Sequence, residues 1–375
     1  MKIVFLVSSM HAGGAERVAA TLASAWAQRG EEVTLVPTYT GRGTCLYPLA
    51  PQVELLWLAD RYGGPRALAG VRKLAALRSL LRERRPDVIV SFLTNVNVVA
   101  LLSSRGLGIP IIVCERTNPA ASDSAGTLLR VLRRYTYPWA DMVTVQAQAS
   151  LEPFARMVPG MRRLEQVPNP MPGELFDARL AACVPGADGR RRLAAMGRLV
   201  PAKQFDLLIA AFAGLAERHA GWDLVIWGEG PMRAQLQRQV DQAGLAGRVS
   251  LPGRTAEPWR ELAQCHAFAL TSRVEGFPNA LLEAMALGLP CLAVDCPSGP
   301  REMTRNGEDG LLVPLGDAAA LAAGLDRMLG DAALRSRLAA AGAVSVRRRY
   351  SLEAVLARWD QLIGTVRGAR IEGVV

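Results

Sequence analysis

The sequence lacks the long apolar segment that a membrane-spanning helix requires. Its longest apolar stretches, such as VIVSFLTNVNVVALL, are interrupted by Asn and Thr, and none reaches the roughly 18 uninterrupted apolar residues of a span. One Lys precedes the run IVFLV near the N-terminus, and that run is too short for a signal peptide. These absences exclude an integral membrane protein and predict a cytoplasmic one.

The sequence also lacks the usual signatures of a metal, a disulfide framework or a nicotinamide cofactor. The cysteines form no CxxC pair, and no DxD pair is present to hold a divalent ion, so we expect reduced thiols and no cofactor. The turn MHAGGAER lacks the third glycine of GxGxxG, and there is no Tyr-xxx-Lys pair. A Rossmann-type oxidoreductase or sugar-nucleotide epimerase is therefore the less favoured enzyme class.

Acidic residues are scarce in the first half of the chain. Residues 1–170 hold 20 Lys and Arg against 12 Asp and Glu, whereas residues 171–375 hold 24 against 22. The excess gathers at 66–87 and 130–139, where Arg alternates with Leu and aromatic residues. The first segment is typical of an amphipathic basic helix, which predicts docking on an anionic bilayer or a diphosphate-bearing lipid. A solvated helix face is the alternative, and no nucleic-acid motif accompanies the charge.

The order of strand-like and helix-like segments predicts an α/β protein. The 375 residues fit two domains of about 150 to 190 residues each. KIVFLVSS, a helical segment and EVTLV begin the chain as a βαβ unit, and the alternation continues. We expect two doubly wound, Rossmann-like sheets facing across a cleft, joined by a Pro- and Gly-rich connection. The predicted division is a first domain at 1–170, a linker at 171–190, a second domain at 191–350, a final helix at 351–366 and a tail at 367–375.

The segment EGFPNALLEAMALG, residues 275–288, places two carboxylates around a predicted helix start. Glu275 precedes the helix, and Glu283 lies one turn inside it. The backbone N–H groups of residues 276–280 are expected to be free to bind a phosphate at the positive end of the helix. Carboxylates beside a phosphate suit a nucleotide sugar, one for the sugar and one for the ribose. The alternative is an ordinary helix N-terminus with two exposed acids.

Two cations are predicted to serve the same phosphate site. MGRLVPAKQFD places Arg198 and Lys203 just after a predicted strand, where both are expected to converge on one diphosphate. Cations there neutralise the charge that builds on a departing nucleoside diphosphate, as a divalent ion does elsewhere. The alternative is two ordinary surface cations. Gly13 and Gly14 would let the backbone approach an anion after the first strand, with a plain tight turn as the alternative.

Six motifs occur together in the order and spacing of a known family: GGAER, VPNP, GRL followed by Lys203, GEGP, EGFPNALLEAMALG and CPSGPRE. Over residues 1–365 the chain resembles family 4 retaining glycosyltransferases of the GT-B fold. GGAER with CPSGPRE is similar to the bacterial branch that extends lipid-linked oligosaccharides and exopolysaccharide repeat units from UDP-sugars, such as the N-acetylgalactosaminyl-diphospho-undecaprenol transferases. The resemblance also implies a last helix, at 352–363, that returns to the first domain.

The resemblance implies roles for individual residues. Glu275 would hold hydroxyls of the donor sugar, and Arg198 and Lys203 would bind the diphosphate, so these three form the catalytic set. Unlike many relatives, the segment IIVCERTNP offers no His near the reacting sugar. The implied donor-binding set comprises Gly14, Gly253, Arg254, Gly276, Phe277, Pro278, Asn279, Ala280 and the ribose ligand Glu283. The acceptor-side candidates are Arg116 or Asn118 in place of that His, and His11 as a base.

The implied reaction moves a hexose or N-acetylhexosamine from a UDP-sugar to a lipid-linked, polyprenyl diphosphate glycan. Transfer would retain the anomeric configuration, without a metal and without a protein nucleophile, and the leaving diphosphate itself would deprotonate the acceptor hydroxyl. The protein would lie at the inner face of the cell membrane, attached peripherally through its basic helices. The alternative that is not an enzyme is a non-catalytic nucleotide-sugar-binding protein of an assembly complex.

Overall fold

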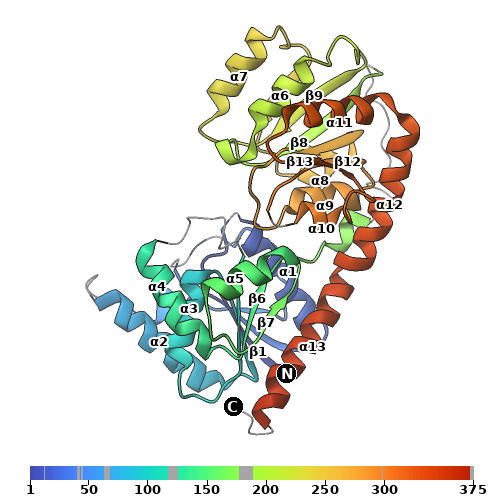
Figure 1. The fold of residues 1–375 in the computed structure, drawn as a ribbon. Helices are drawn as coiled ribbons and strands as arrows, with labels where there is room; N and C mark the ends of the chain where they lie inside the picture. Colours follow the sequence, from blue (N-terminus) through green and yellow to red (C-terminus); the bar gives the residue numbers. More distant parts are fainter. Residues whose placement is uncertain are drawn as a thin grey trace. The chain divides into compact units, whose positions relative to one another are not determined.

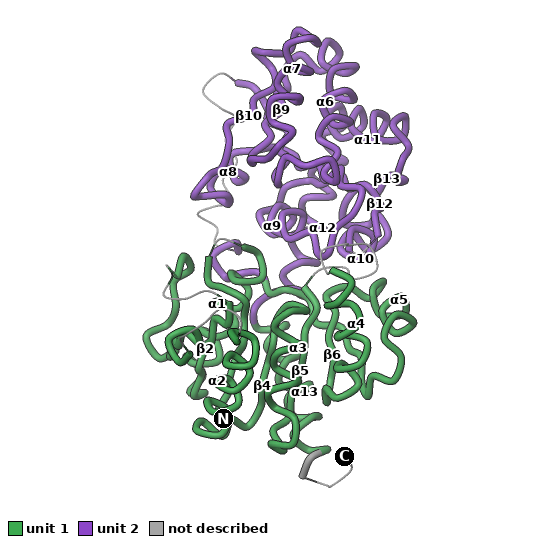
Figure 2. Tube along the Cα trace, turned by 90° about the vertical axis from the view of Figure 1, so that its left-hand side faces the viewer, with its two compact units in different colours: residues 1–170, 353–375 green, residues 171–352 purple. Residues whose placement is uncertain are grey.

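The structure is a computed structural model that describes residues 1–11, 13–39, 43, 45–62, 68–116, 126–176, 189–297 and 299–371. The chain divides into two compact units, which Figure 2 colours separately. Unit 1 consists of residues 1–170 and 353–375, and unit 2 of residues 171–352. Each unit contains one parallel sheet with helices on both faces, which confirms the predicted fold class of two Rossmann-like domains.

Unit 1 is built on a parallel sheet with the strand order β3-β2-β1-β4-β5-β6-β7. Most of its strand residues are buried and apolar, as expected for a sheet covered on both faces. The order of the strands reverses between β1 and β4, and in doubly wound sheets the carboxyl edge at such a reversal is where ligands bind. The strands are β1 (Lys2–Val7), β2 (Glu32–Pro37), β3 (Glu54–Leu55), β4 (Val88–Phe92), β5 (Ile111–Cys114), β6 (Met142–Val145) and β7 (Leu164–Gln166).

Different sets of helices cover the two faces of this sheet. Side chains of α2, α3 and α5 share one apolar cluster with the sheet, and α4 packs on α3 beside them. The opposite face is covered by α1 and by the last helix, α13 (Figure 1). The helices of unit 1 are α1 (Gly14–Gln28), α2 (Ala69–Arg84), α3 (Thr94–Ser104), α4 (Thr127–Thr136), α5 (Leu151–Met157) and α13 (Leu352–Ile371).

The last helix belongs to unit 1 although the helix before it belongs to unit 2. The Trp359 ring meets the Trp26 ring of α1 edge-on, with 5.6 Å between the centroids. Further along the sheet, Arg358 Nη2 lies 2.6 Å from Glu165 Oε2 of β7. Both faces of a parallel sheet must be covered by helices. On this face α1 covers only part of the sheet, and α13 covers the rest. The predicted return of the last helix is therefore confirmed, and this helix runs to Ile371, beyond the predicted end at 366.

Unit 2 repeats the arrangement with the strand order β10-β9-β8-β11-β12-β13, which reverses between β8 and β11. Helices α6, α7 and α11 pack on one face, α8, α9 and α10 on the other, and α12 contributes to both clusters. The strands are β8 (Arg191–Met196), β9 (Trp222–Trp227), β10 (Val249–Gly253), β11 (Ala267–Leu270), β12 (Cys291–Asp295) and β13 (Leu311–Pro314). The helices are α6 (Phe205–Ala213), α7 (Arg233–Gln242), α8 (Pro258–Ala263), α9 (Asn279–Ala286), α10 (Pro300–Met303), α11 (Ala318–Gly330) and α12 (Ala332–Tyr350).

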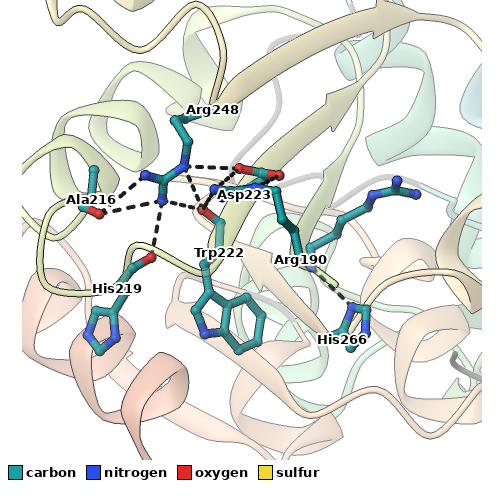
Figure 3. Close-up of polar contacts among 8 residues, drawn as sticks. Arg190, Ala216, His219, Trp222, Asp223, Arg248 and His266 are labelled. Atoms are coloured by element: carbon teal, nitrogen blue, oxygen red, sulfur yellow. Dashed lines mark hydrogen bonds and ion pairs between the residues drawn. The ribbon is translucent and has the colours of Figure 1, made fainter. Parts of the chain in front are cut away.

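A polar network ties together the amino ends of four strands in unit 2 (Figure 3). Asp223 of β9 accepts hydrogen bonds from Arg190, just before β8, and from Arg248, just before β10, at 2.6 to 3.0 Å. His266, just before β11, accepts from the backbone N–H of Arg192 through Nδ1 at 3.1 Å. Burial, together with the neighbouring arginines, lowers the pKa of His266. The titratable groups of this edge therefore serve the fold, and chemistry must be sought at the opposite, carboxyl edge.

Candidate functional site

Lys203 and Glu275 form an ion pair where the strand order of unit 2 reverses. Lys203 follows β8, Glu275 follows β11, and Lys203 Nζ lies 2.5 Å from Glu275 Oε1. The side chains keep only 21% and 11% of their surface exposed. The carboxyl edge at such a reversal is where doubly wound sheets bind ligands. Both residues were predicted as site residues, whereas their direct pairing was not.

Two hydroxyls at the end of β11 hold this pair in place. Ser272 Oγ donates to Glu275 Oε1 at 2.5 Å, and Thr271 Oγ1 donates to the carbonyl oxygen of Lys203 at 2.9 Å. One hydroxyl therefore orients the carboxylate, and the other fixes the backbone that carries the amine. Sequence reasoning missed both residues, because Ser and Thr after a strand are common. Only the fold brings Thr271 to Lys203, 68 positions away, whereas Ser272 lies three positions from Glu275.

Arg198 adds an uncompensated positive charge to the same loop. It is the second residue after β8, its side chain is exposed, and no carboxylate pairs with it in the described part of the chain. Lys203, by contrast, is neutralised by Glu275. An anion that enters this edge therefore meets one unpaired cation and one cation that it must share with a carboxylate. The convergence of Arg198 and Lys203 on one diphosphate stays a prediction.

Glycines allow the loops after β8 and β9 to approach closely. A Cβ atom on Gly228 would lie 1.8 Å from the carbonyl oxygen of Gly197, and one on Gly230 would lie 2.3 Å from that of Leu199. Real Cβ contacts are never this short. The GEGP motif, which carries little meaning alone, therefore lets the β9 loop lie against the GRL loop that carries Arg198 and Lys203.

The two acids of the EGFPN segment are shielded from solvent. Glu283 lies inside α9, as predicted, and is 3% exposed. The Glu275 side chain is 11% exposed and is held by Lys203 and Ser272. Because buried carboxylates are unfavourable without partners, neither is an incidental surface acid. The alternative of an ordinary helix N-terminus with two exposed acids is therefore wrong.

The set of free N–H groups before α9 is smaller than predicted. Pro278 has no N–H, and the Asn279 N–H donates to the Phe277 carbonyl oxygen at 2.9 Å. The N–H groups of Gly276, Phe277 and Ala280 have no hydrogen-bond partner among the described residues. The prediction that all groups from 276 to 280 are free is corrected to these three.

The family resemblance predicts that the loop at residues 251–257 covers the base of the donor nucleotide, and this loop begins in the edge strand β10. Gly253 ends this strand with φ of +94°, and its carbonyl oxygen accepts from the Gly228 N–H at 2.8 Å. Arg254 follows with an exposed side chain. Gly253 thus connects this loop to the GEGP loop, and contact of either residue with a base stays a prediction.

The glycine turn of unit 1 already has a carboxylate beside it. A Cβ atom on Gly13 would lie 2.1 Å from Glu16 Oε2, and Ser9 Oγ donates to Glu16 Oε1 at 2.9 Å. This negative charge opposes close approach of an anion to Gly13. Gly14 begins α1 and His11 is exposed after β1; the roles predicted for both stay predictions.

Arg116 follows β5 at the carboxyl edge of the unit 1 sheet and is 9% exposed. Its Nη1 donates to Asn169 Oδ1 at 2.8 Å, and its guanidinium carbon lies 3.4 Å from the centroid of the Phe92 ring. Burial lowers the pKa of Arg116 to about 10. Asn169 belongs to the VPNP motif, whose role the sequence did not indicate. The other candidate substitute for the family His, Asn118, lies outside the described residues.

Glu115 turns away from Arg116 into a separate buried network. Its carboxylate accepts from Tyr137 Oη at 2.5 Å and from Thr94 Oγ1 at 2.8 Å. Asn97 Nδ2 donates to the same Tyr137 oxygen at 2.9 Å. Burial raises the pKa of Glu115. This network joins α3 and the segment after α4 to the end of β5, so it supports the backbone that carries Arg116.

Two family models match the chain, one in each half. The model described as "Glycosyl transferase 4-like domain" matches residues 13–170, and the model described as "Glycosyl transferases group 1" matches residues 184–344. Together with the two Rossmann-like sheets, these matches define a glycosyltransferase of the GT-B fold. The chain belongs to glycosyltransferase family 4.

Individual relatives agree with this assignment. The chain is 27% identical to a Campylobacter jejuni GalNAc-α-(1→4)-GalNAc-α-(1→3)-diNAcBac-PP-undecaprenol α-1,4-N-acetyl-D-galactosaminyltransferase, over 98% of this chain and 100% of the relative. It is also 27% identical to the N-acetylgalactosamine-N,N'-diacetylbacillosaminyl-diphospho-undecaprenol 4-α-N-acetylgalactosaminyltransferase of that organism, over 89% and 92%. Anabaena HepE, solved in complex with UDP and glucose, has the same fold, with a TM-score of 0.78 at 20% identity over 97% and 100% of the two chains.

Proposed function

We propose that the protein transfers a hexose or N-acetylhexosamine from a UDP-sugar to a lipid-linked glycan, with retention of configuration. The observation that carries the proposal is the Lys203–Glu275 pair at the strand reversal of unit 2, with the exposed Arg198 on the same loop. A diphosphate suits the cations and the free N–H groups before α9, and a sugar hydroxyl suits the carboxylate. UDP as the nucleotide is supported by the HepE complex, and the lipid-linked acceptor by the names of the two Campylobacter relatives.

The residues of unit 2 suggest how the reaction proceeds. Arg198, Lys203 and the N–H groups of Gly276, Phe277 and Ala280 would stabilise the charge that develops on the leaving UDP. This array supplies positive charge of the kind that a divalent ion supplies elsewhere, so we propose a metal-independent reaction. Glu275 would exchange its contact with Lys203 for sugar hydroxyls and position the donor. The leaving diphosphate would accept the proton of the acceptor hydroxyl.

A membrane surface is the proposed location of the acceptor, and α4 is the element that favours it. Leu128, Val131 and Tyr135 lie on one face of α4 and are 72%, 47% and 68% exposed, with Arg130 and Arg134 exposed beside them. An apolar stripe flanked by arginines suits an anionic bilayer. No helix in the described ranges is both long and apolar enough to cross a membrane. The exposed stripe of α4 is the reason why we propose peripheral attachment to a membrane, on the cytoplasmic side that the family resemblance implies.

The basic helix that the sequence favoured for this attachment, α2, uses much of its charge internally. Lys73 is buried, Arg78 donates to the carbonyl oxygens of Ser103 and Arg105, and Arg84 lies 2.5 Å from a carboxylate oxygen of Glu54. These cations serve the fold of unit 1, so the docking role falls chiefly to α4.

The direct test is transfer from UDP-GalNAc, UDP-galactose and UDP-glucose to a polyprenyl diphosphate glycan by the purified protein. We expect product with one donor, an α-linkage by NMR, and no loss of rate with EDTA. Lys203→Met and Glu275→Gln should each lower kcat/KM about 100-fold or more, while Arg238→Met, an exposed cation on α7, should leave it unchanged. Binding of the donor without any transfer would support a non-catalytic protein instead.

A further inference from the structure

Arg116 is a buried cation without a counter-ion in unit 1. Its Nη1 has a partner, whereas Nε and Nη2 are both buried and have no hydrogen-bond partner among the described residues. Ion pairs and hydrogen bonds normally compensate a buried charge, because removal from water is otherwise strongly unfavourable. A guanidinium that is nine-tenths buried and unsatisfied on one whole edge therefore calls for an explanation.

The adjacent acid does not provide that compensation. Glu115 is committed to Tyr137 and Thr94, and its nearest cation is Arg133, whose Nη1 lies 3.8 Å from the carboxylate. Glu115 therefore has its own partners, in α3 and in the segment after α4. No ion pair joins any carboxylate of the described chain to Arg116.

The orientation of Arg116 is fixed rather than adaptable. Its guanidinium stacks on Phe92 at the end of β4, and Nη1 is held by Asn169, which also accepts from Gln146 Nε2 at 2.7 Å. Gln146 follows β6 directly, so three neighbouring strand ends define the position. The unsatisfied edge consists of Nε and Nη2, the two N–H groups that point in parallel and bind the two oxygens of a carboxylate or phosphate.

We propose that the Nε–Nη2 edge of Arg116 binds an oxyanion of a substrate and so replaces the family His with a group that recognises charge. The oxyanion is either a phosphate of the UDP-sugar or a phosphate or carboxylate of the glycan acceptor. Both sources share the same chemistry, and the experiment separates them. The assignment of this oxyanion to the donor or to the acceptor rests on the proposed function. The binding of an oxyanion by Arg116 does not.

The test measures calorimetric binding and the melting temperature with UDP, inorganic pyrophosphate and glucuronate, and with glucose as the neutral control. We expect at least one anion to stabilise the parent and to bind about 10- to 100-fold more weakly to Arg116→Met. Arg116→Lys keeps the charge without the paired N–H groups, so it should lose most of that affinity. Asn169→Asp places a carboxylate beside Nη1 and should weaken the same anion by competition.

The stability of the variants separates a binding role from a structural one. Replacing an unpaired buried cation with an apolar side chain is expected to leave the melting temperature of Arg116→Met unchanged or higher. A loss of UDP affinity in Arg116→Met assigns the oxyanion to the donor, and a loss confined to glucuronate assigns it to the acceptor, whereas pyrophosphate resembles the diphosphate of both substrates and tests oxyanion binding alone. The proposal is overturned if no anion stabilises the parent, or if Arg116→Met and Arg116→Lys bind all three as the parent does. The proposed function survives the second of these results, in which UDP still binds the parent, whereas a parent that no anion stabilises, UDP included, contradicts the proposed function as well.

Discussion

At the scale of single residues, the close approach of glycine backbones to one another decides the geometry of the donor site. Gly228 has φ of +147°, and its Cα faces the carbonyl oxygen of Gly197 with no room for a side chain. Gly197 in turn lies against Lys203, whose Cε would be 3.2 Å from a Cβ atom at 197. The packing of Gly228 on Gly197, and of Gly197 on the Lys203 side chain, thus positions the Lys203 amine that pairs with Glu275.

Gly228→Ala should therefore disturb both the fold of unit 2 and the site. The added methyl must displace the Gly197 backbone, so we expect a loss of about 1–3 kcal/mol in stability and about tenfold or more in UDP affinity. Calorimetry and thermal unfolding measure the two effects. Gly247→Ala is the matched control, because nothing lies within 4 Å of its Cβ position. Equal behaviour of the two variants would contradict the packing argument.

A pair of tyrosines tests the buried network of unit 1. Tyr137 is 0% exposed, donates to Glu115 and accepts from Asn97, whereas Tyr135 is 68% exposed. Tyr137→Phe leaves buried polar groups unsatisfied and should cost about 1–3 kcal/mol, measured as a lower melting temperature. Tyr135→Phe makes the same chemical change in solvent and should have almost no effect. Destabilisation of similar size in both would mean that the network contributes nothing.

Sequence reasoning found the residues that lie within motifs and missed those that act across the fold. Lys203 and Glu275 were identified because each stands in a characteristic loop. Thr271, which holds the backbone of Lys203, and Asn169, which holds Arg116, were not assigned these roles. Asn169 is 53 positions from its partner, and no local pattern encodes such a contact.

At the scale of elements, α13 is the helix that is hardest to assign to the unit 1 sheet from the sequence, because it comes from the far end of the chain. The alternation of strands and helices was predictable from apolar periodicity, since buried parallel strands are continuous apolar runs. That periodicity does not show which sheet the last helix covers. The family resemblance indicated unit 1, and the Trp26–Trp359 contact explains why α13 stays there. The end of this helix was predicted too early because Gly364 and Gly368, which favour a helix end, lie inside it.

Trp359→Ala should detach α13 from α1. Trp359 is 0% exposed, and its loss creates a large cavity, which typically costs about 3–5 kcal/mol. Asp360→Ala is the control, because it removes only a surface ion pair with Arg29, worth about 1 kcal/mol or less. Limited proteolysis and thermal unfolding should show α13 released in the first variant and retained in the second. An unchanged melting temperature for Trp359→Ala would contradict the assigned role of this helix.

At the scale of the whole molecule, charge and exposed apolar side chains are concentrated in the first half of the chain. Residues 1–170 carry most of the net charge of +10. They also contain eight of the ten large apolar side chains found exposed among the described residues. This asymmetry suits a protein that presents unit 1 to a negatively charged surface, where each nearby cation contributes about 1 kcal/mol.

Binding to vesicles tests this asymmetry. The parent should sediment with phosphatidylglycerol vesicles at low salt and less at high salt, because salt screens the attraction. A double variant with Leu128→Glu and Val131→Glu should lose binding, since it removes the apolar stripe of α4 and adds like charge. Val344→Glu changes an equally exposed apolar residue of α12 and should bind as the parent does. Vesicle binding by all three proteins, or by none, would remove α4 from the account.

The central claim is that the carboxyl edge of the unit 2 sheet binds the diphosphate of a UDP-sugar. Calorimetric titration with UDP, and with GDP, ADP and NAD as competitors, tests it most directly on the parent, Lys203→Met, Glu283→Ala and the control Arg238→Met. We expect that UDP alone binds well, that Lys203→Met and Glu283→Ala each lose about tenfold or more in UDP affinity, and that Arg238→Met binds as the parent does. Preference for NAD, or full UDP affinity in Lys203→Met, would contradict it.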